Sequence, residues 1–290
     1  AIMSSTDPAQ SALAASLAQC AISTSPAILK VQTSQLVHRL NLLSAFFPSQ
    51  AYTETPLAGS TVLEIGCGQG DTTIILAHAV SPGGKVLALD PAPLDYGSPY
   101  TLEQAQGHLS ASRLGDRIEW IRADPLEAAE NRSLDGKDLK WVVLAHSLFY
   151  MSGEDYVYRL LKVLANYGKK HGGLKLLFAE WGMKASVPGA EAHLLAVKAQ
   201  TAQPLRGWNV QMSREPAKVA ELAKKAGWVV EREAWVEAPQ MDDGDWEVSA
   251  AKSMDKGEST REAKALLEKM EESIKGPIEC MDVWTCVFSV

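Results

Sequence analysis

Hydrophobic residues along this chain fall into two kinds of run, and the alternation of the two predicts the fold. Short apolar runs bounded by turn residues are typical of buried strands, whereas apolar residues three and four positions apart indicate helices. The predicted strands are Thr61–Ile65, Lys85–Asp90, Ile118–Ala123, Trp141–Ala145, Leu174–Glu180, Trp228–Glu237 and Val283–Val290. The helices predicted between them are Asp71–Val80, Thr101–Ser112, Glu154–Lys170 and Pro216–Ala226. Strands alternating with helices favour a doubly wound α/β sheet, whose ligand lies beyond the carboxyl ends of the strands.

Three segments lie outside this alternation. Apolar spacing predicts helices over 4–20 and 30–46, so residues 1–56 are expected to form an N-terminal helical cap. Residues 57–290 are expected to form one α/β domain with insertions at 187–214 and 238–278. Both insertions are candidates for lids or walls of a substrate pocket.

Composition and charge narrow the classes of partner. The 290 residues are 46% hydrophobic and 22% charged, which is ordinary for a globular protein. The formal net charge of −7 provides no basic excess to replace counterions on a nucleic acid. Lys and Arg do not cluster beyond pairs, and no apolar run reaches the ~20 residues that span a bilayer. Neither nucleic acid nor a membrane is therefore expected as a partner.

Cysteine usage points to a reducing compartment. Cys20, Cys67, Cys280 and Cys286 lack the CxxC spacing of a zinc site, and no metal is expected. Four cysteines in a chain of this length are more typical of free thiols than of a disulfide framework. The first basic residue is Lys30, so a secretory signal is not indicated and a cytoplasmic protein is expected.

A glycine-rich loop follows the first predicted strand. The stretch Thr61-Val-Leu-Glu-Ile-Gly-Cys-Gly-Gln-Gly70 places three glycines within five residues, although a tight turn requires only one. A dinucleotide-binding loop has the pattern G-x-G-x-x-G, whose third glycine would fall at Asp71. Here the third glycine comes one residue early. This disfavours a dinucleotide as the ligand and an NAD-dependent oxidoreductase as the function.

The carboxylate of Glu64, two positions before the first glycine, also bears on the ligand. A phosphate about 5 Å from it would cost about 3 kcal/mol at an effective dielectric constant of about 20. An ammonium or sulfonium group would be attracted instead, and a carboxylate on the same ligand can bind the N–H groups of the loop. S-adenosylmethionine carries this pattern of charges and no phosphate, so the loop favours it.

Two acids end the next two strands. Asp90 closes the second strand, where a carboxylate can accept hydrogen bonds from both ribose hydroxyls. Asp124 follows the third strand, where it can accept a proton from an adenine amino group. Either acid alone is as often a helix cap or a solvated loop residue. In series with the glycine loop, the two indicate one ligand across three strand ends.

The stretch from Glu64 to Gly70, followed by Asp90 and Asp124, resembles the class I S-adenosylmethionine-dependent methyltransferases. The resemblance covers roughly residues 57–180 by motif, and the proline-rich stretch 91–100 departs from it. It implies an α/β fold, a seven-stranded Rossmann-like sheet with helices on both faces and an antiparallel last strand. It also implies S-adenosylmethionine as cofactor and S-adenosylhomocysteine as product. The cofactor-binding residues that it implies are Glu64, Gly66, Cys67, Gly68, Gly70, Asp90, Pro91, Asp124, Pro125 and His146.

Candidate catalytic and substrate-binding residues follow the fourth and fifth strands. Methyl transfer depends on proximity and orientation, and a phenolic acceptor also benefits from a general base. His146 is the candidate base or substrate anchor, and a contact with the cofactor or simple packing is the alternative. Glu180 can bind a cationic acceptor or cap its loop. Tyr52, Phe149, Tyr150 and Trp181 are expected, with Glu180, to form the substrate pocket, although core packing explains each individually.

Three further histidines receive no role. His38 is expected to be a surface or helix-face residue of an N-terminal helix, and His78 and His108 are expected on covering helices.

These features predict an enzyme, a methyltransferase that acts on oxygen, nitrogen or carbon of a small organic acceptor of secondary metabolism. The Asn/Asp-Pro-Pro-Tyr/Phe signature of many methyltransferases acting on planar nitrogens is replaced by Ala145-His-Ser-Leu-Phe-Tyr150. Nucleic acid and glutamine substrates are therefore disfavoured. One alternative stays open: a protein of this fold that uses bound S-adenosylmethionine in a non-methylating cyclisation or rearrangement. A non-catalytic partner subunit is disfavoured, because a scaffold has no need for the glycine loop and both acids. The sequence does not predict the oligomeric state.

Overall fold

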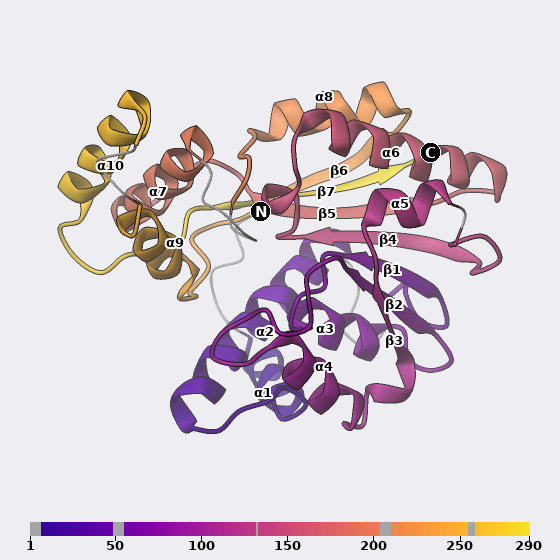
Figure 1. Ribbon diagram of the computed structural model, residues 1–290. Helices are drawn as coiled ribbons and strands as arrows, with labels where there is room; N and C mark the ends of the chain where they lie inside the picture. The colour runs from indigo at the N-terminus through magenta and orange to yellow at the C-terminus, as the bar shows by residue number, and fades with distance from the viewer. Residues whose placement is uncertain (1–6, 49–54, 132, 204–209, 255–258) are drawn as a thin grey trace.

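The computed structural model describes residues 7–48, 55–131, 133–203, 210–254 and 259–290. Within them, strands form one mixed sheet in the order β3-β2-β1-β4-β5-β7-β6 (Figure 1). The strands of these described ranges are β1 (Thr61–Ile65), β2 (Lys85–Asp90), β3 (Ile118–Arg122), β4 (Leu139–Ala145), β5 (Lys175–Trp181), β6 (Val229–Val236) and β7 (Val283–Ser289). Neighbours from β3 to β5 pair in parallel, and β7 is antiparallel to β5 and β6. The predicted sheet is confirmed, and the strand ends differ from prediction by at most two residues.

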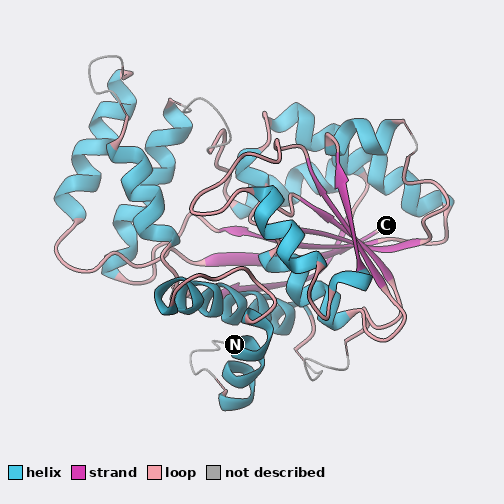
Figure 2. Ribbon diagram, turned by 60° about the horizontal axis from the view of Figure 1, so that its bottom comes forward, coloured by secondary structure: helices cyan, strands magenta, loops and turns pink. Residues whose placement is uncertain are grey.

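Helices cover both faces of the sheet (Figure 2). In Figure 1, α5, α6 and α8 lie on one side, and α1 to α4 lie on the other. A separate group, α7, α9 and α10, packs together at one end of the molecule. The helices are α1 (Pro8–Ala18), α2 (Pro26–Phe46), α3 (Asp71–Ala79), α4 (Leu102–Ser110), α5 (Pro125–Glu130), α6 (Glu154–Lys170), α7 (Glu191–Ala202), α8 (Pro216–Ala226), α9 (Asp243–Lys252) and α10 (Arg261–Ser273).

The two insertions are mainly helical. The segment predicted as 187–214 contains α7, and the segment 238–278 contains α9 and α10. The sequence analysis did not predict α5, whose six residues are too few for a periodic pattern. Its start is nevertheless visible in the sequence, because Asp124 is its N-cap and Pro125 its first residue.

The N-terminal helix α2 is buried on several sides. Leu36 and Leu40 are fully buried, but so are the polar side chains Gln35 and His38, and Arg39 nearly so. The helix contacts α3, β6 and β7, so it lies against the α/β sheet rather than apart from it. The division of the chain at residue 56 remains a prediction.

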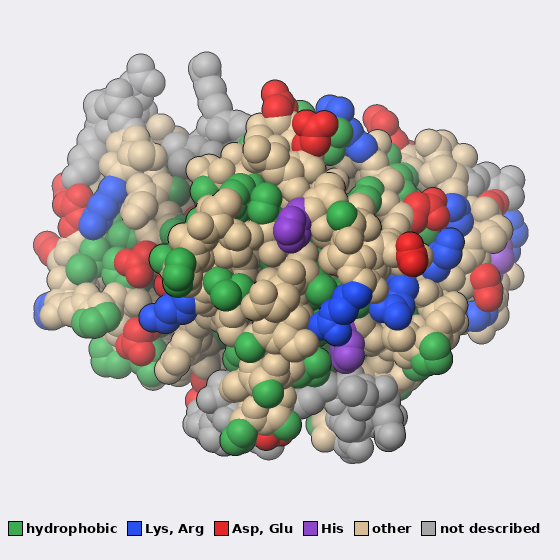
Figure 3. All heavy atoms as spheres, turned by 90° about the horizontal axis from the view of Figure 1, so that it is seen from below, with side chains coloured by type: hydrophobic (Ala, Val, Ile, Leu, Met, Phe, Trp, Pro, Cys, Tyr) green, Lys and Arg blue, Asp and Glu red, His purple; other side chains and the backbone are tan. Residues whose placement is uncertain are grey.

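Charged side chains of both signs are mixed on the face seen in Figure 3. On this face, basic side chains stand in small groups with acidic ones nearby. Among the described residues, no helix is long and apolar enough to cross a membrane, and no group of three His, Cys, Asp or Glu side chains is arranged to hold a metal ion. Cys20, Cys67, Cys280 and Cys286 are all free and buried.

Candidate functional site

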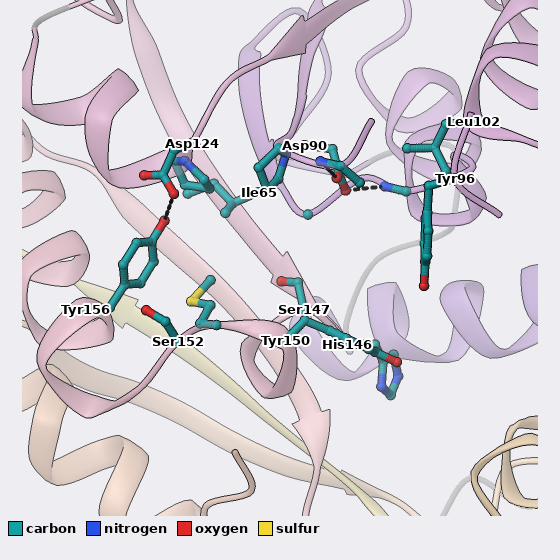
Figure 4. Close-up of a pocket in the computed structure, with 16 residues that line it drawn as sticks. Ile65, Asp90, Tyr96, Leu102, Asp124, His146, Ser147, Tyr150, Ser152 and Tyr156 are labelled. Carbon is teal, nitrogen blue, oxygen red and sulfur yellow. Dashed lines mark hydrogen bonds between the residues drawn. The ribbon is translucent and has the colours of Figure 1, made fainter. Parts of the chain in front are cut away.

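A cavity of about 410 Å³ lies at the carboxyl ends of β1 to β4 (Figure 4). This is the edge of the sheet at which the sequence predicts a ligand. The cavity is lined by Ile65, Gly66, Gly68, Asp90, Pro91, Ala92, Tyr96, Leu102, Asp124, Pro125, His146, Ser147, Tyr150, Met151, Ser152 and Tyr156.

The glycine loop after β1 needs its glycines for different reasons. Gly66, Gly68 and Gly70 all have positive φ angles, of 80°, 50° and 104°. A Cβ atom on Gly66 would lie 2.4 Å from the Cβ of Ser147, so the loops after β1 and β4 touch there. A Cβ atom on Gly68 would meet nothing within 4 Å, which leaves its backbone open to the cavity. Gly70 is the N-cap of α3 and packs near Leu109 instead.

Asp90 accepts a hydrogen bond from the glycine loop and also lines the cavity. Its Oδ2 accepts a hydrogen bond from the Gly68 N–H at 2.8 Å, and its Oδ1 accepts one from the Ala92 N–H at 2.9 Å. A carboxylate has about four lone-pair sites, so these two bonds leave an acceptor position on each oxygen. The side chain is therefore fixed in place and still able to bind a pair of hydroxyls.

Asp124 serves as a helix cap and as a cavity wall. Its Oδ1 accepts from the N–H groups of Leu126 and Glu127 at the start of α5. Its Oδ2 accepts from the hydroxyl of Tyr156 at 3.0 Å (Figure 4). Burial raises the pKa of Tyr156, which keeps this hydroxyl protonated as a donor. The sequence analysis missed Tyr156, because an aromatic residue near the start of α6 looks like any core residue.

Glu64 does not line the cavity. Its side chain is buried, and its Oε2 accepts a hydrogen bond from Thr73 Oγ1 at 2.6 Å. Burial raises the pKa of Glu64 to about 8, so this carboxyl group is largely neutral at pH 7. The sequence argument placed the charge that repels phosphate on Glu64, but the structure shows the carboxylate of Asp90 in contact with the loop.

Cys67 and Gly70 were also among the cofactor-binding residues predicted from the sequence, but neither lines the cavity. Cys67 borders a separate groove against α4, and burial raises the pKa of its thiol. The cofactor residues predicted from sequence that the structure brings together are Gly66, Gly68, Asp90, Pro91, Asp124, Pro125 and His146.

His146 lies at the end of β4 between two partners. Its Nε2 is 2.8 Å from Nε2 of His38, and its Nδ1 is 3.4 Å from Oε1 of Glu180. Its φ angle of 54° is uncommon for a residue other than glycine, and such strain clusters at functional sites. Of the two positions expected for His38, the surface is wrong, because its side chain is 1% exposed and lies on the face of α2 that meets His146.

The carboxyl group of Glu180 accepts hydrogen bonds from three backbone N–H groups. Its Oε2 accepts from the N–H groups of Leu148 at 2.9 Å and Phe149 at 3.4 Å, and its Oε1 accepts from the Trp181 N–H at 3.0 Å. The side chain is buried, so it caps the short turn after β4 instead of facing a ligand in the cavity.

The aromatic residues predicted for the substrate pocket divide between cavity and core. Tyr150 lines the cavity. Phe149 is 1% exposed and belongs to the hydrophobic core. Trp181 is buried, with its ring centroid 4.6 Å from that of His146 and 4.6 Å from that of His193. Tyr52 lies outside the described residues.

In sequence, the chain is similar to known methyltransferases. Residues 62–172 match the model of a methyltransferase domain. The chain is 29% identical over 223 residues to methyltransferase phomM of Diaporthe leptostromiformis, over 63% of this chain and 57% of that protein. It therefore spans little more than half the length of this relative.

Two solved structures are similar in fold. A cyclopropane-fatty-acyl-phospholipid synthase-like protein from Lactobacillus casei ATCC 334 aligns with a TM-score of 0.78 and 25% identity, over 96% of this chain and 98% of that one. The [4+2]-cyclase SpnF aligns with a TM-score of 0.50 and 13% identity, over 89% of this chain and 80% of that one.

Proposed function

Because it belongs to the class I S-adenosylmethionine-dependent methyltransferases, we propose that this chain transfers a methyl group to oxygen, nitrogen or carbon of a small organic acceptor. The family's cofactor, S-adenosylmethionine, supplies a methyl group on a cationic sulfur when it is bound. We propose an acceptor of the secondary-metabolite type. The proposed compartment is the cytoplasm, where four buried free cysteines remain thiols.

The geometry of Asp90 is the observation that carries the proposal. Its carboxylate is held by two backbone N–H groups and has an acceptor position left on each oxygen, which matches a ribose diol. The same charge, in contact with Gly68 of the glycine loop, disfavours a phosphate at that loop. This supports S-adenosylmethionine over a dinucleotide.

Other cavity residues fit the remainder of the cofactor. In this proposal, Asp124 Oδ2 accepts a hydrogen bond from the adenine amino group, beside the hydroxyl of Tyr156. Pro91 and Pro125 supply apolar walls for the adenosine. The open backbone at Gly68, together with the amino end of α3, faces the methionine portion.

The acceptor is proposed to occupy the other end of the cavity. Figure 4 shows Tyr96, Tyr150 and His146 on the side away from Asp124 and Tyr156. Two aromatic side chains and an imidazole suit a flat organic molecule. Their contribution to the rate is to hold the reacting atom of the acceptor close to the methyl group and in line with it.

Calorimetry and product analysis test this function. We expect S-adenosylhomocysteine to bind in titrations and NADH to give no heat of binding. Incubation with methyl-labelled S-adenosylmethionine and panels of phenols, carbon acids and amines should release S-adenosylhomocysteine and a labelled product.

Two results would redirect the proposal. Tight binding of NADH without binding of S-adenosylhomocysteine would refute the cofactor assignment. Consumption of an acceptor without formation of S-adenosylhomocysteine would support the cyclisation or rearrangement that the sequence left open.

A further inference from the structure

A line of three polar side chains joins the N-terminal helix to the sheet beside the cavity. His38 comes from α2, His146 from the end of β4 and Glu180 from β5. The Nε2 atoms of the two histidines are 2.8 Å apart, and Glu180 Oε1 is 3.4 Å from His146 Nδ1. We call these three residues the His–His–Glu array. In the function proposed above, the adenosine is held by other residues, chiefly Asp90 and Asp124.

The positions of the protons in the array follow from Glu180. Its Oε2 accepts hydrogen bonds from two backbone N–H groups and its Oε1 from a third, so both oxygens act as acceptors. The 3.4 Å contact with His146 Nδ1 is within ion-pair range but makes no hydrogen bond. A proton on Nδ1 is attracted to the carboxylate, whereas a lone pair there is repelled. His146 is therefore the Nδ1–H tautomer.

This tautomer determines the state of His38. With its proton on Nδ1, His146 presents a lone pair at Nε2, so Nε2 of His38 must be the donor of the 2.8 Å hydrogen bond. Neutral imidazole carries one proton, which leaves the lone pair of His38 on Nδ1. Nε2 of His146 then accepts from His38 while its Nδ1–H faces Glu180 at 3.4 Å, so the lone pair left over in the array belongs to His38.

The surroundings keep that nitrogen unprotonated and without a partner. Burial, then His146, then the cation of Arg39 hold the pKa of His38 well below its usual range. Across Trp181 lies His193, whose pKa burial lowers to about 3. Nδ1 of His38 is buried and has no hydrogen-bond partner among the described residues. A buried polar atom without a partner costs about 1–3 kcal/mol, and such an atom calls for an explanation.

We propose that Nδ1 of His38, and not His146, receives the proton of the methyl acceptor, and that the acceptor is accordingly a hydroxyl or a carbon acid. This inference rests on the proposed function. The acceptor atom keeps the electron pair of its bond to hydrogen and forms the bond to the methyl carbon, while the carbon–sulfur pair stays on sulfur. The proton enters at His38 Nδ1. The proton on His38 Nε2 passes to Nε2 of His146, and the positive charge comes to rest beside Glu180.

The geometry gives each member of the array a distinct part. His38 is 1% exposed, so the side chains around it must move before an acceptor reaches Nδ1. Until they move, water does not reach Nδ1 of His38, so its lone pair stays available for the proton of the acceptor. His146 takes up the resulting positive charge, and the nearby carboxyl group of Glu180 stabilises it. Two histidines without an acidic neighbour would lack this stabilisation. A neutral amine needs no such base before it is methylated, which is why the array favours a hydroxyl or a carbon acid.

Nitrogen NMR of the histidine rings tests the array in the unliganded chain. The six histidines are labelled with ¹⁵N and assigned with single His→Gln variants. Between pH 7 and 8 we expect the proton of His146 on Nδ1 and that of His38 on Nε2, with and without S-adenosylhomocysteine. A His146 ring protonated at Nε2, or a His38 ring protonated at Nδ1, would overturn the proposal.

Turnover of phenols of graded acidity tests the direction of proton transfer. In His38→Gln, the side-chain amide can still donate to His146 but cannot take a proton. We expect kcat to fall about 100-fold or more with weakly acidic phenols, in the range typical of a general base. The loss should shrink for nitrophenols that are already ionised, while the affinity for S-adenosylhomocysteine stays within about twofold of the native value. His108→Gln, at an exposed position on α4, is the matched control.

Each other outcome has a distinct meaning. An equal loss with all phenols would reduce His38 to a positioning residue, and no loss would remove it from the reaction. Methylation of amines by the native chain, without any turnover of phenols or carbon acids, would contradict the acceptor class. If the native chain forms no S-adenosylhomocysteine with any acceptor, the proposed function fails, whereas the NMR result still decides the array.

Discussion

At the scale of single residues, Asp90 has two tasks in this structure. It orders the glycine loop through the Gly68 N–H, and it offers the free acceptor positions that we assign to ribose. Asp124 also has two tasks: it caps the start of α5, and it accepts a hydrogen bond from the hydroxyl of Tyr156. Substitutions at these positions therefore need controls that separate binding from local folding.

Replacing Asp90 with alanine should weaken the binding of S-adenosylhomocysteine by at least about tenfold, or about 1.4 kcal/mol. The cause is the loss of the ribose acceptor together with an unpaired N–H at Gly68. Isothermal titration calorimetry measures this affinity. The control is Asp138→Asn, because Asp138 is an exposed acid whose salt bridge is with Lys140. Native affinity in Asp90→Ala would disprove the ribose assignment.

Replacing Tyr156 with phenylalanine should reduce the affinity for S-adenosylhomocysteine about fivefold, as expected for one hydrogen bond of about 1 kcal/mol. The substitution removes the donor that orients Asp124 Oδ2 and leaves the ring in the cavity wall. Fluorescence or calorimetric titration gives the affinity. Tyr158→Phe, on the same helix but away from the cavity, should bind like the native chain. Equal effects of the two substitutions would argue against a role for the Tyr156 hydroxyl.

At the scale of elements, the site depends on how closely the loops after β1 and β4 approach. Gly66 contacts Ser147, and His146 immediately precedes Ser147 in the β4 loop. The two loops therefore form one unit, in which the cofactor loop and the His–His–Glu array are held against each other. Helix α2 completes the unit by supplying His38.

The contact between these loops can be tested with two glycines of nearly equal φ angle. Gly66 has φ of 80° and Gly136 has φ of 78°, but a Cβ atom at Gly136 would meet nothing within 4 Å. Alanine at either position is strained by about 1–2 kcal/mol, and at Gly66 the clash with Ser147 should add about 1–3 kcal/mol. Urea denaturation of Gly66→Ala and Gly136→Ala measures the difference. Equal free energies of unfolding would show that the loops tolerate separation.

At the scale of the whole molecule, the buried carboxyl group of Glu64 links the stability of the central sheet to pH. It sits on β1, bonded to Thr73 of α3, and its pKa rises from 4.5 to about 8 on folding. The folded chain thus keeps a proton that the unfolded chain has lost between these two values. Stability contributed by this group is present below pH 4.5 and falls as the pH rises toward 8.

The Glu64→Gln variant should lose this pH dependence while it keeps an oxygen that accepts the hydrogen bond from Thr73. In the native chain, Glu64 contributes a decrease in the free energy of unfolding of at most about 1.4 kcal/mol per pH unit. Urea titrations at intervals from pH 5 to 8 compare the two proteins. Parallel pH profiles of native and variant would show that Glu64 is ionised in the folded state.

The strands and the core of the cofactor site were predictable because their signals are local. Each strand is an apolar run bounded by turn residues. Asp90 ends β2, and Gly68 and Asp124 lie within three residues of the ends of β1 and β3. The short helix α5 escaped the periodic pattern, although Asp124 and Pro125 mark its start. Tyr156 was missed because its partner, Asp124, lies 32 residues away.

His38 illustrates what a local pattern cannot decide. On most surface helices, polar residues mark the exposed side, so the sequence suggested a surface or helix-face position for His38 and no partner for it. Helix α2 is instead buried on several sides, and its polar residues Gln35, His38 and Arg39 have partners elsewhere in the fold. The weak separation of polar and apolar residues along α2 was the available signal.

The sequence by itself determined the alternation of strands and helices, the glycine loop and the two acids that follow it, because these depend on residues a few positions apart. Only the tertiary structure decided which acid bears the charge near the loop and which histidine nitrogen is free. Burial neutralises Glu64 while Asp90 bonds the loop, and folding brings His38 within 2.8 Å of His146 across 108 residues. Protonation and pairing depend on what surrounds a group in space, and that is settled only when distant segments pack together.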